Sequence, residues 1–341
     1  NLTIDEKVDK IVASMSKTEK IGQMVMIGIQ GTKVDDDSLY MLNQYHMGGV
    51  ILFDRNMESP EQVKQLTSDL QSQSNEKVPL FIGIDEEGGD VVRMAEKLTP
   101  PPSQKEIGAT GDIEQAKTWA IKTAKSLKEM GINVNFAPVA DVGSNDKRSY
   151  STDTNTVIDF VRAATKGYQQ ENIIYSLKHF PGIGKGRVDS HVDSSSIDVT
   201  KEILMAEDII PFKTIIDENG PNDYFILVSH LKYPALDEEY PASLSSKIMT
   251  DLLRNELGYK GIIITDDMEM GAVANHNDFR SIGVNAVKAG ADIVLVCHEY
   301  EHQQEVYLGL LDAVNSGEIS QERIDESVKR IIKVKLLHLY Q

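Results

Sequence analysis

Short apolar runs recur along the chain at intervals of roughly 40 residues, and segments with helical periodicity lie between most of them. The runs predict eight strands, at residues 21–29, 48–53, 79–85, 132–139, 173–179, 223–230, 261–265 and 292–297. A strand with one solvated face alternates apolar and polar residues, whereas these runs are apolar at consecutive positions. Continuous apolar strands are typical of a parallel sheet that is buried on both faces.

The segments between the runs predict helices at residues 5–15, 59–75, 157–170, 203–216, 248–256, 282–288, 303–314 and 323–339, and one more from 112 to a cap at Gly131. Eight strands alternating with helices predict an α/β fold, a single (β/α)8 barrel of the TIM type whose regularity the pattern leaves open. We expect one catalytic domain over residues 1–341. A doubly wound open sheet is the alternative, although no glycine fingerprint for a dinucleotide follows the first strand.

Composition and charge narrow the possible partners. The chain is 40% hydrophobic and 26% charged, as in soluble globular proteins, and no apolar run approaches the roughly 20 residues of a membrane helix. The net charge of −18 repels nucleic acid, so we expect no nucleic-acid partner. The only cysteine, Cys297, excludes an intramolecular disulfide.

Two further expectations concern the cell and the assembly. The sequence opens at Asn1 rather than Met, which favours an exported chain whose signal or lipoprotein segment has been removed over a cytoplasmic one. We also expect a monomer that needs neither a cofactor nor a metal ion.

Polar residues gather where the predicted strands end: Asp85, Glu86, Glu87, Asp141, Arg148, Lys178, His179, Asp189, His191, His230, Asp266 and Asp267. Because the carboxyl ends of all barrel strands share one face, we expect these side chains to form an active site. Carboxylates, cations and imidazoles together suit a hydroxyl-rich ligand. A retaining sugar hydrolase needs a carboxylate nucleophile and a proton donor, for which Asp266 and His191 are our candidates.

The loop that follows the fifth strand carries His191. Three glycines within five residues, Gly182, Gly184 and Gly186, predict a mobile loop, which the Asp189-Ser190-His191 triplet closes. Alternative interpretations are weaker, since the loop lacks the spacing of a phosphate-binding loop or of a zinc site. An isolated Asp-X-His triplet is usually a turn with a solvated histidine. Only the other polar residues at the strand ends favour a catalytic role for this one.

Several motifs together resemble the β-N-acetylglucosaminidase branch of glycoside hydrolase family 3. They are Ile84-Asp85-Glu86-Glu87-Gly88-Gly89 with Arg93, Asn135-Phe136-Ala137-Pro138-Val139-Ala140-Asp141 with Arg148-Ser149, Lys178-His179-Phe180-Pro181-Gly182, Asp189-Ser190-His191 and Thr265-Asp266-Asp267-Met268. The resemblance covers nearly the whole chain. It implies a (β/α)8 barrel and a reaction that retains anomeric configuration through a covalent glycosyl-enzyme.

By position, the resemblance implies that Asp266 is the nucleophile, His191 the acid/base and Asp189 its orienting partner. It also implies that five residues bind the non-reducing-end sugar: Asp85, Arg93, Arg148, Lys178 and His179. The chain departs from the pattern at two loop positions, because many relatives have His in place of Ile183 and a small or acidic residue in place of Lys185.

The leading hypothesis is a hydrolase that releases terminal β-linked N-acetylglucosamine from cell-wall (peptidoglycan) fragments or chitin-type oligosaccharides. A β-N-acetylglucosaminide phosphorylase that uses the same residues is the alternative among enzymes. A non-catalytic sugar-binding surface protein is the alternative from another class, although it would not need the set of Asp266, Asp189 and His191.

Overall fold

Eight parallel strands form a closed barrel in a computed structural model that describes residues 1–95, 98–143, 147–186 and 196–340. The strands are β1 (Val25–Gly28), β2 (Gly49–Leu52), β3 (Phe81–Ile84), β4 (Val134–Asn135), β5 (Ile174–Phe180), β6 (Tyr224–Val228), β7 (Ile262–Thr265) and β8 (Val294–Val296). From β1 to β7 each strand pairs with its neighbours in chain order, and β8 pairs with β1. A parallel bridge from Ile264 to Ile293 joins β7 to the start of β8. The predicted barrel is therefore confirmed, and the open doubly wound alternative is wrong.

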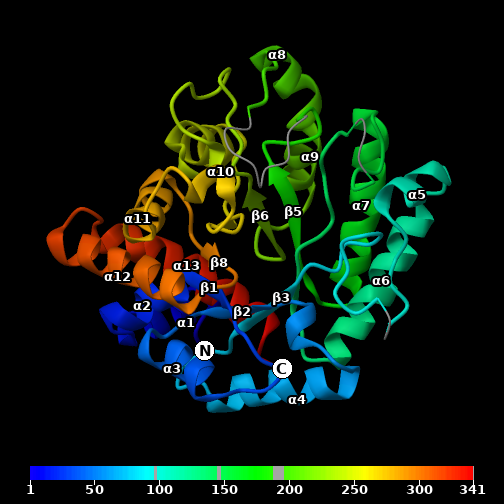
Figure 1. The fold of residues 1–341 in the computed structure, drawn as a ribbon. Coiled ribbons are helices and arrows are strands. Elements are labelled where there is room, and N and C mark those ends of the chain that lie inside the picture. The colour runs from blue at the N-terminus through cyan, green and yellow to red at the C-terminus, as the bar shows by residue number, and fades with distance from the viewer. Residues whose placement is uncertain (96–97, 144–146, 187–195, 341) are drawn as a thin grey trace.

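Helices surround the strands (Figure 1). The longer ones are α1 (Ile4–Ser14), α3 (Asp36–Gln44), α4 (Pro60–Gln73), α6 (Glu114–Glu129), α7 (Thr154–Gln170), α9 (Ile210–Glu218), α11 (Phe279–Ala289), α12 (Tyr300–Ser316) and α13 (Gln321–His338). Shorter ones are α2 (Lys17–Gln23), α5 (Gln104–Ala109), α8 (Lys201–Ile203), α10 (Gly271–Ala274), and the 3-10 helices η1 (Asp54–Asn56) and η3 (Ala242–Leu244). In the described part of the chain, no helix has both the length and the apolarity to cross a membrane.

The predicted elements differ from the structure mainly at their ends. Residues 21–23 belong to α2 rather than to the first strand, because Ser16 and Glu19 form a capping box that starts a helix there. The segment 203–216 is not one α-helix, since the π-helical turn η2 (Leu204–Asp208) interrupts it, and residues 247–256 form the π-helix η4 (Lys247–Glu256). The sequence pattern did not predict α3, α5 or α10.

Charged residues are buried at the end of the barrel opposite the carboxyl ends of the strands. The Asp292 carboxylate, fully buried, accepts hydrogen bonds from Arg254 (2.9 Å), Arg330 (2.9 Å), Ser327 (2.6 Å) and the Ile263 amide (2.8 Å). These contacts join α13 and η4 to the start of β7, at Ile263, and to Asp292, two residues before β8. Charge pairing therefore fixes the strand ends that lie away from the predicted active site.

Candidate active site

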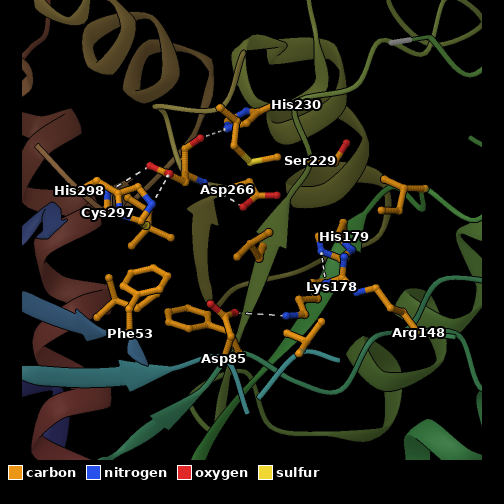
Figure 2. A pocket seen from close by; sticks show the side chains of 18 of the residues that line it. Phe53, Asp85, Arg148, Lys178, His179, Ser229, His230, Asp266, Cys297 and His298 are labelled. Carbon is orange, nitrogen blue, oxygen red and sulfur yellow. Dashed lines mark hydrogen bonds and ion pairs between the residues drawn. The ribbon is translucent and has the colours of Figure 1, made fainter. Parts of the chain in front are cut away.

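A pocket of about 440 Å³ opens at the carboxyl ends of the strands. Most of the predicted site residues that the structure describes line it: Asp85, Arg93, Arg148, Lys178, His179, His230, Asp266 and Asp267. Glu86, Glu87 and Asp141 were also predicted but do not line it. Asp85 directly follows β3, Lys178 and His179 lie at the carboxyl end of β5, and Asp266 directly follows β7. Asp189 and His191 lie outside the described residues. Residues that are far apart in the sequence thus lie around one pocket, because each is at the carboxyl end of a barrel strand (Figure 2).

Lys178 is the centre of a buried ion-pair network on one wall of the pocket. Its Nζ lies 3.3 Å from Asp85 Oδ1 and 3.0 Å from Glu87 Oε2. Arg148 holds Glu87 with two parallel hydrogen bonds, from Nε to Oε1 (2.8 Å) and from Nη2 to Oε2 (2.9 Å). Arg93 Nη2 donates to Asp85 Oδ2 (3.2 Å). The network therefore fixes the Lys178 and Asp85 side chains before any ligand arrives.

The same network keeps its carboxyl groups ionised. Burial raises the pKa of Glu87, but the nearby Lys178 and Arg148 cations outweigh burial and lower the pKa to about 2. Burial likewise raises the pKa of Asp85, and Lys178 and Arg93 more than offset it, so the pKa falls below its ordinary value. An ionised Asp85 can only accept hydrogen bonds, which suits the hydroxyl groups of a ligand.

Asp141 orients His179 at the end of β5. His179 Nδ1 lies 2.9 Å from Asp141 Oδ2, and a carboxylate there can only accept, so Nδ1 carries the hydrogen. Asp141 Oδ1 accepts from the backbone amides of His179 (3.1 Å) and Ile183 (3.0 Å). His179 Nε2, which faces Arg148 Nη2 at 3.5 Å, is then the acceptor nitrogen. Asp141 therefore sets both the ring orientation and the start of the following loop.

Asp266 lies on another wall of the pocket. Its backbone amide extends the β6–β7 pairing by donating to Val228 O (3.0 Å), and its Oδ1 accepts from the Asp267 amide (2.9 Å). Figure 2 shows the Asp266 carboxylate in the same pocket that Asp85 and Lys178 face. A carboxylate oxygen is therefore available opposite the sugar-binding candidates.

Phe53 and His298 also line the pocket, although the sequence analysis did not single them out. Their ring centroids are 5.0 Å apart, and the Arg93 guanidinium carbon lies 5.0 Å from the Phe53 centroid. Phe53 directly follows β2, and His298 is the second residue after β8. Their positions at the carboxyl ends of predicted strands could therefore have identified both.

Comparison with known proteins then decides the family. The sequence matches the glycosyl hydrolase family 3 N terminal domain over residues 16–334. The chain belongs to glycosyl hydrolase family 3. It is 35% identical over 326 residues to Beta-hexosaminidase A of Pseudoalteromonas piscicida, covering 86% of this chain and 54% of the relative. It is 31% identical over 318 residues to a Beta-hexosaminidase of Nitrosomonas eutropha, covering 89% of this chain and 90% of the relative.

Solved structures agree with this family. A glycoside hydrolase family 3 beta-N-acetylglucosaminidase from Paenibacillus sp. str. FPU-7 superposes with a TM-score of 0.93 at 37% identity, covering 96% of this chain and 63% of that one. The chain thus spans about half the length of the Pseudoalteromonas relative and under two thirds of the Paenibacillus protein, but most of the Nitrosomonas relative.

In this family 3 barrel, the loop after β5 begins with close contacts. Gly182 has a φ of +122°, which favours glycine, and a Cβ on Gly184 would lie 1.9 Å from the Val142 carbonyl oxygen. Lys185 Nζ contacts Asp208 Oδ2 (2.8 Å), a fully buried carboxylate in η2. The two glycines are therefore required by the packing of residues 181–186. The departure from the family pattern at Lys185 supplies an ion pair, while Ile183 lines the pocket.

Proposed function

We propose that this chain is a retaining glycosidase that releases terminal β-linked N-acetylglucosamine from cell-wall fragments or chitin-type oligosaccharides. In this proposal Asp266 is the nucleophile, His191 the acid/base and Asp189 its orienting partner. Asp85, Arg93, Arg148, Lys178 and His179 hold the sugar. The names of the relatives, Beta-hexosaminidase and beta-N-acetylglucosaminidase, support this substrate class.

One observation carries the proposal. The carboxylate of Asp266 and the ionised Asp85–Lys178 pair line the same pocket. A volume of about 440 Å³ is at the small end of ligand pockets, which suits one sugar residue better than a long segment of polysaccharide. Charged donors and acceptors already fixed by their neighbours can hold hydroxyl groups without a further cost in side-chain ordering.

The chemistry requires two displacements at the anomeric carbon. Asp266 attacks it and forms a glycosyl ester while the acid/base gives its proton to the departing oxygen; water, deprotonated by the same group, then cleaves the ester. Hydrogen bonding from the Asp267 amide to Asp266 Oδ1 fixes the carboxylate, so one lone pair can face the sugar. Two inversions leave the configuration of the product unchanged.

The charges around the pocket favour water over phosphate as the second nucleophile. Carboxyl groups outnumber cations there. Asp85, Asp90, Asp266 and Asp267 line the pocket, with Glu87 and Asp141 just behind its wall, beside three cations, from Lys178, Arg93 and Arg148. Lys178, Arg93 and Arg148 each contact a carboxylate. A phosphate dianion would therefore be repelled more than a neutral water molecule.

Turnover of an aryl β-N-acetylglucosaminide tests the proposal. We expect release of N-acetylglucosamine as the β-anomer, seen by NMR before mutarotation, and no turnover of the α-anomeric substrate. First release of the α-anomer would contradict the retaining mechanism. Formation of N-acetylglucosamine 1-phosphate as the main product in phosphate buffer would instead favour the phosphorylase.

A further inference from the structure

We propose that Asp267 is a positioning residue for the nucleophile, which holds the Asp266 segment against three neighbouring loops and places a second negative charge beside the reacting sugar. The inference rests on the proposed function, because it takes Asp266 as the nucleophile.

The contacts of Asp267 fix its position from several sides. Its Oδ1 accepts hydrogen bonds from the backbone amides of Glu269 (3.1 Å) and Cys297 (3.1 Å), and its amide donates to Asp266 Oδ1 (2.9 Å). Its carbonyl oxygen accepts from His230 Nε2 (2.7 Å). Since Nε2 then carries the hydrogen, His230 Nδ1 accepts from the Ser243 hydroxyl (2.6 Å). Loops after β6, β7 and β8 therefore all converge on one residue next to Asp266.

Glu269 strengthens the same attachment. Its carboxylate accepts from the amides of His298 (2.6 Å) and Glu299 (3.0 Å), and its Oε2 lies 2.6 Å from His302 Nδ1. Glu299, the first residue before α12, makes no capping bond with its own side chain. Glu269 thus caps α12 from the neighbouring loop, where an anion is favoured by the helix dipole. The segment from Asp266 to Glu269 is joined to the β8–α12 connection at both ends.

The groups around the Asp267 carboxyl leave it short of positive charge. Glu269 and Asp266 are acidic, the buried Cys297 thiol has a raised pKa, and burial lowers the pKa of His230. The His298 ring is also near, with Nε2 3.7 Å from Asp267 Oδ2. Burial lowers the pKa of His298, and so does Arg55, whose Nη1 lies 2.8 Å from His298 Nδ1.

Burial, with repulsion from Glu269 and Asp266, raises the pKa of Asp267 to about 7. Its charge therefore changes near neutral pH. Asp267 lines the same pocket as Asp266. The sugar ring becomes cationic as the nucleophile attacks, so an ionised Asp267 stabilises the transition state and a protonated one does not.

The test compares Asp267→Asn with wild type on an aryl glycoside whose leaving group needs little protonation. The Asp267→Asn side chain keeps the Oδ1 acceptor for the two amides but has no charge, so we expect kcat/KM to fall roughly 100-fold, by a similar factor on a disaccharide, because the lost charge affects the glycosylation transition state of both substrates. In wild type, kcat/KM on the aryl substrate falls as pH drops through about 7. In Asp267→Asn this step is absent, since the amide has no proton to gain.

A matched control is Asp237→Asn. Asp237 is also buried and accepts from two backbone amides, of Glu239 (2.9 Å) and Tyr240 (3.1 Å), but it does not line the pocket. We expect this variant to lose stability while its rate stays within about twofold of wild type.

The inference is overturned if Asp267→Asn has the same rate as the Asp237→Asn control. It is also overturned if Asp267→Asn is slower but its kcat/KM still falls as pH drops through about 7, or if kcat/KM of wild type shows no such fall. If Asp267→Asn does not fold, Asp267→Glu replaces it. That variant keeps the charge but displaces it, so we expect a slower enzyme with the step retained, and loss of the step would count against the inference. Absence of turnover by wild type would refute the proposed function itself.

Discussion

Glu87 provides a quantitative test of the buried charge network. Its side chain is 2% exposed and lies between the Arg148 fork and the Lys178 ammonium. Glu87→Gln keeps the size of the side chain but removes its charge and places an NH2 group against one of the two cations. Removing the carboxylate from a buried ion pair is strongly destabilising, because the desolvated cations lose part of the negative charge that compensates them.

The structure gives the magnitude. Lys178 and Arg148 lower the pKa of Glu87 from 4.5 to about 2 against the opposing effect of burial. At about 1.4 kcal/mol for each tenfold change in proton affinity, the ionised Glu87 contributes about 3 kcal/mol to stability at pH 7. The folded-state pKa is the lower one, so this contribution is present above pH 4.5 and is lost as pH falls towards 2. Linkage gives about 1.5 kcal/mol at pH 3.

Urea unfolding of wild type and Glu87→Gln between pH 7 and pH 3 measures this difference. Glu218→Gln is the control, because Glu218 forms the same two-bond fork with Arg162 at 2.8 Å but is 41% exposed. We expect the control to lose less than about 1 kcal/mol. The reasoning is refuted if Glu87→Gln costs no more than the control, or if its cost stays constant as pH falls.

Three further predictions follow from other residues. Lys335 is fully buried, and burial lowers its pKa to about 7. Between pH 7 and 10 only the unfolded chain still holds the proton, so the wild-type free energy of unfolding should rise by up to about 1.4 kcal/mol per pH unit. Urea unfolding should show no such rise in Lys335→Met. Gly184→Ala should lose at least about tenfold in activity because its Cβ meets the Val142 carbonyl at 1.9 Å, whereas in Gly186→Ala the nearest atom is 3.1 Å away and kinetics should show near-normal activity. His191→Ala should lose roughly 100-fold on a disaccharide and far less on an activated aryl glycoside, and equal losses would argue against an acid/base role.

The sequence was sufficient to predict the barrel and the residues at its strand ends. All eight strands occur where continuous apolar runs predicted them, because burial on both faces leaves a direct trace in the pattern. The predicted Asp85, Lys178 and Asp266 lie around one pocket for the same reason: each ends or follows a parallel strand.

Other features depend on contacts that no local pattern carries. The role of Glu87 as the partner of Lys178 and Arg148 arises only when β3, β5 and the loop after β4 come together. Whether an acidic residue such as Asp267 binds backbone amides or a ligand depends on the β8 loop, 30 residues away. The π-helices η2 and η4 keep an ordinary helical pattern of apolar residues, so periodicity alone could not separate them from α-helices.

Trapping the glycosyl-enzyme tests the central proposal most directly. The enzyme would be incubated with a fluorinated slow N-acetylglucosaminide, digested, and its peptides sequenced by mass spectrometry. We predict one sugar adduct, on Asp266, and none in Asp266→Asn. An adduct on Asp267 or elsewhere, or none despite turnover of the substrate, would contradict the assignment of Asp266 as the nucleophile.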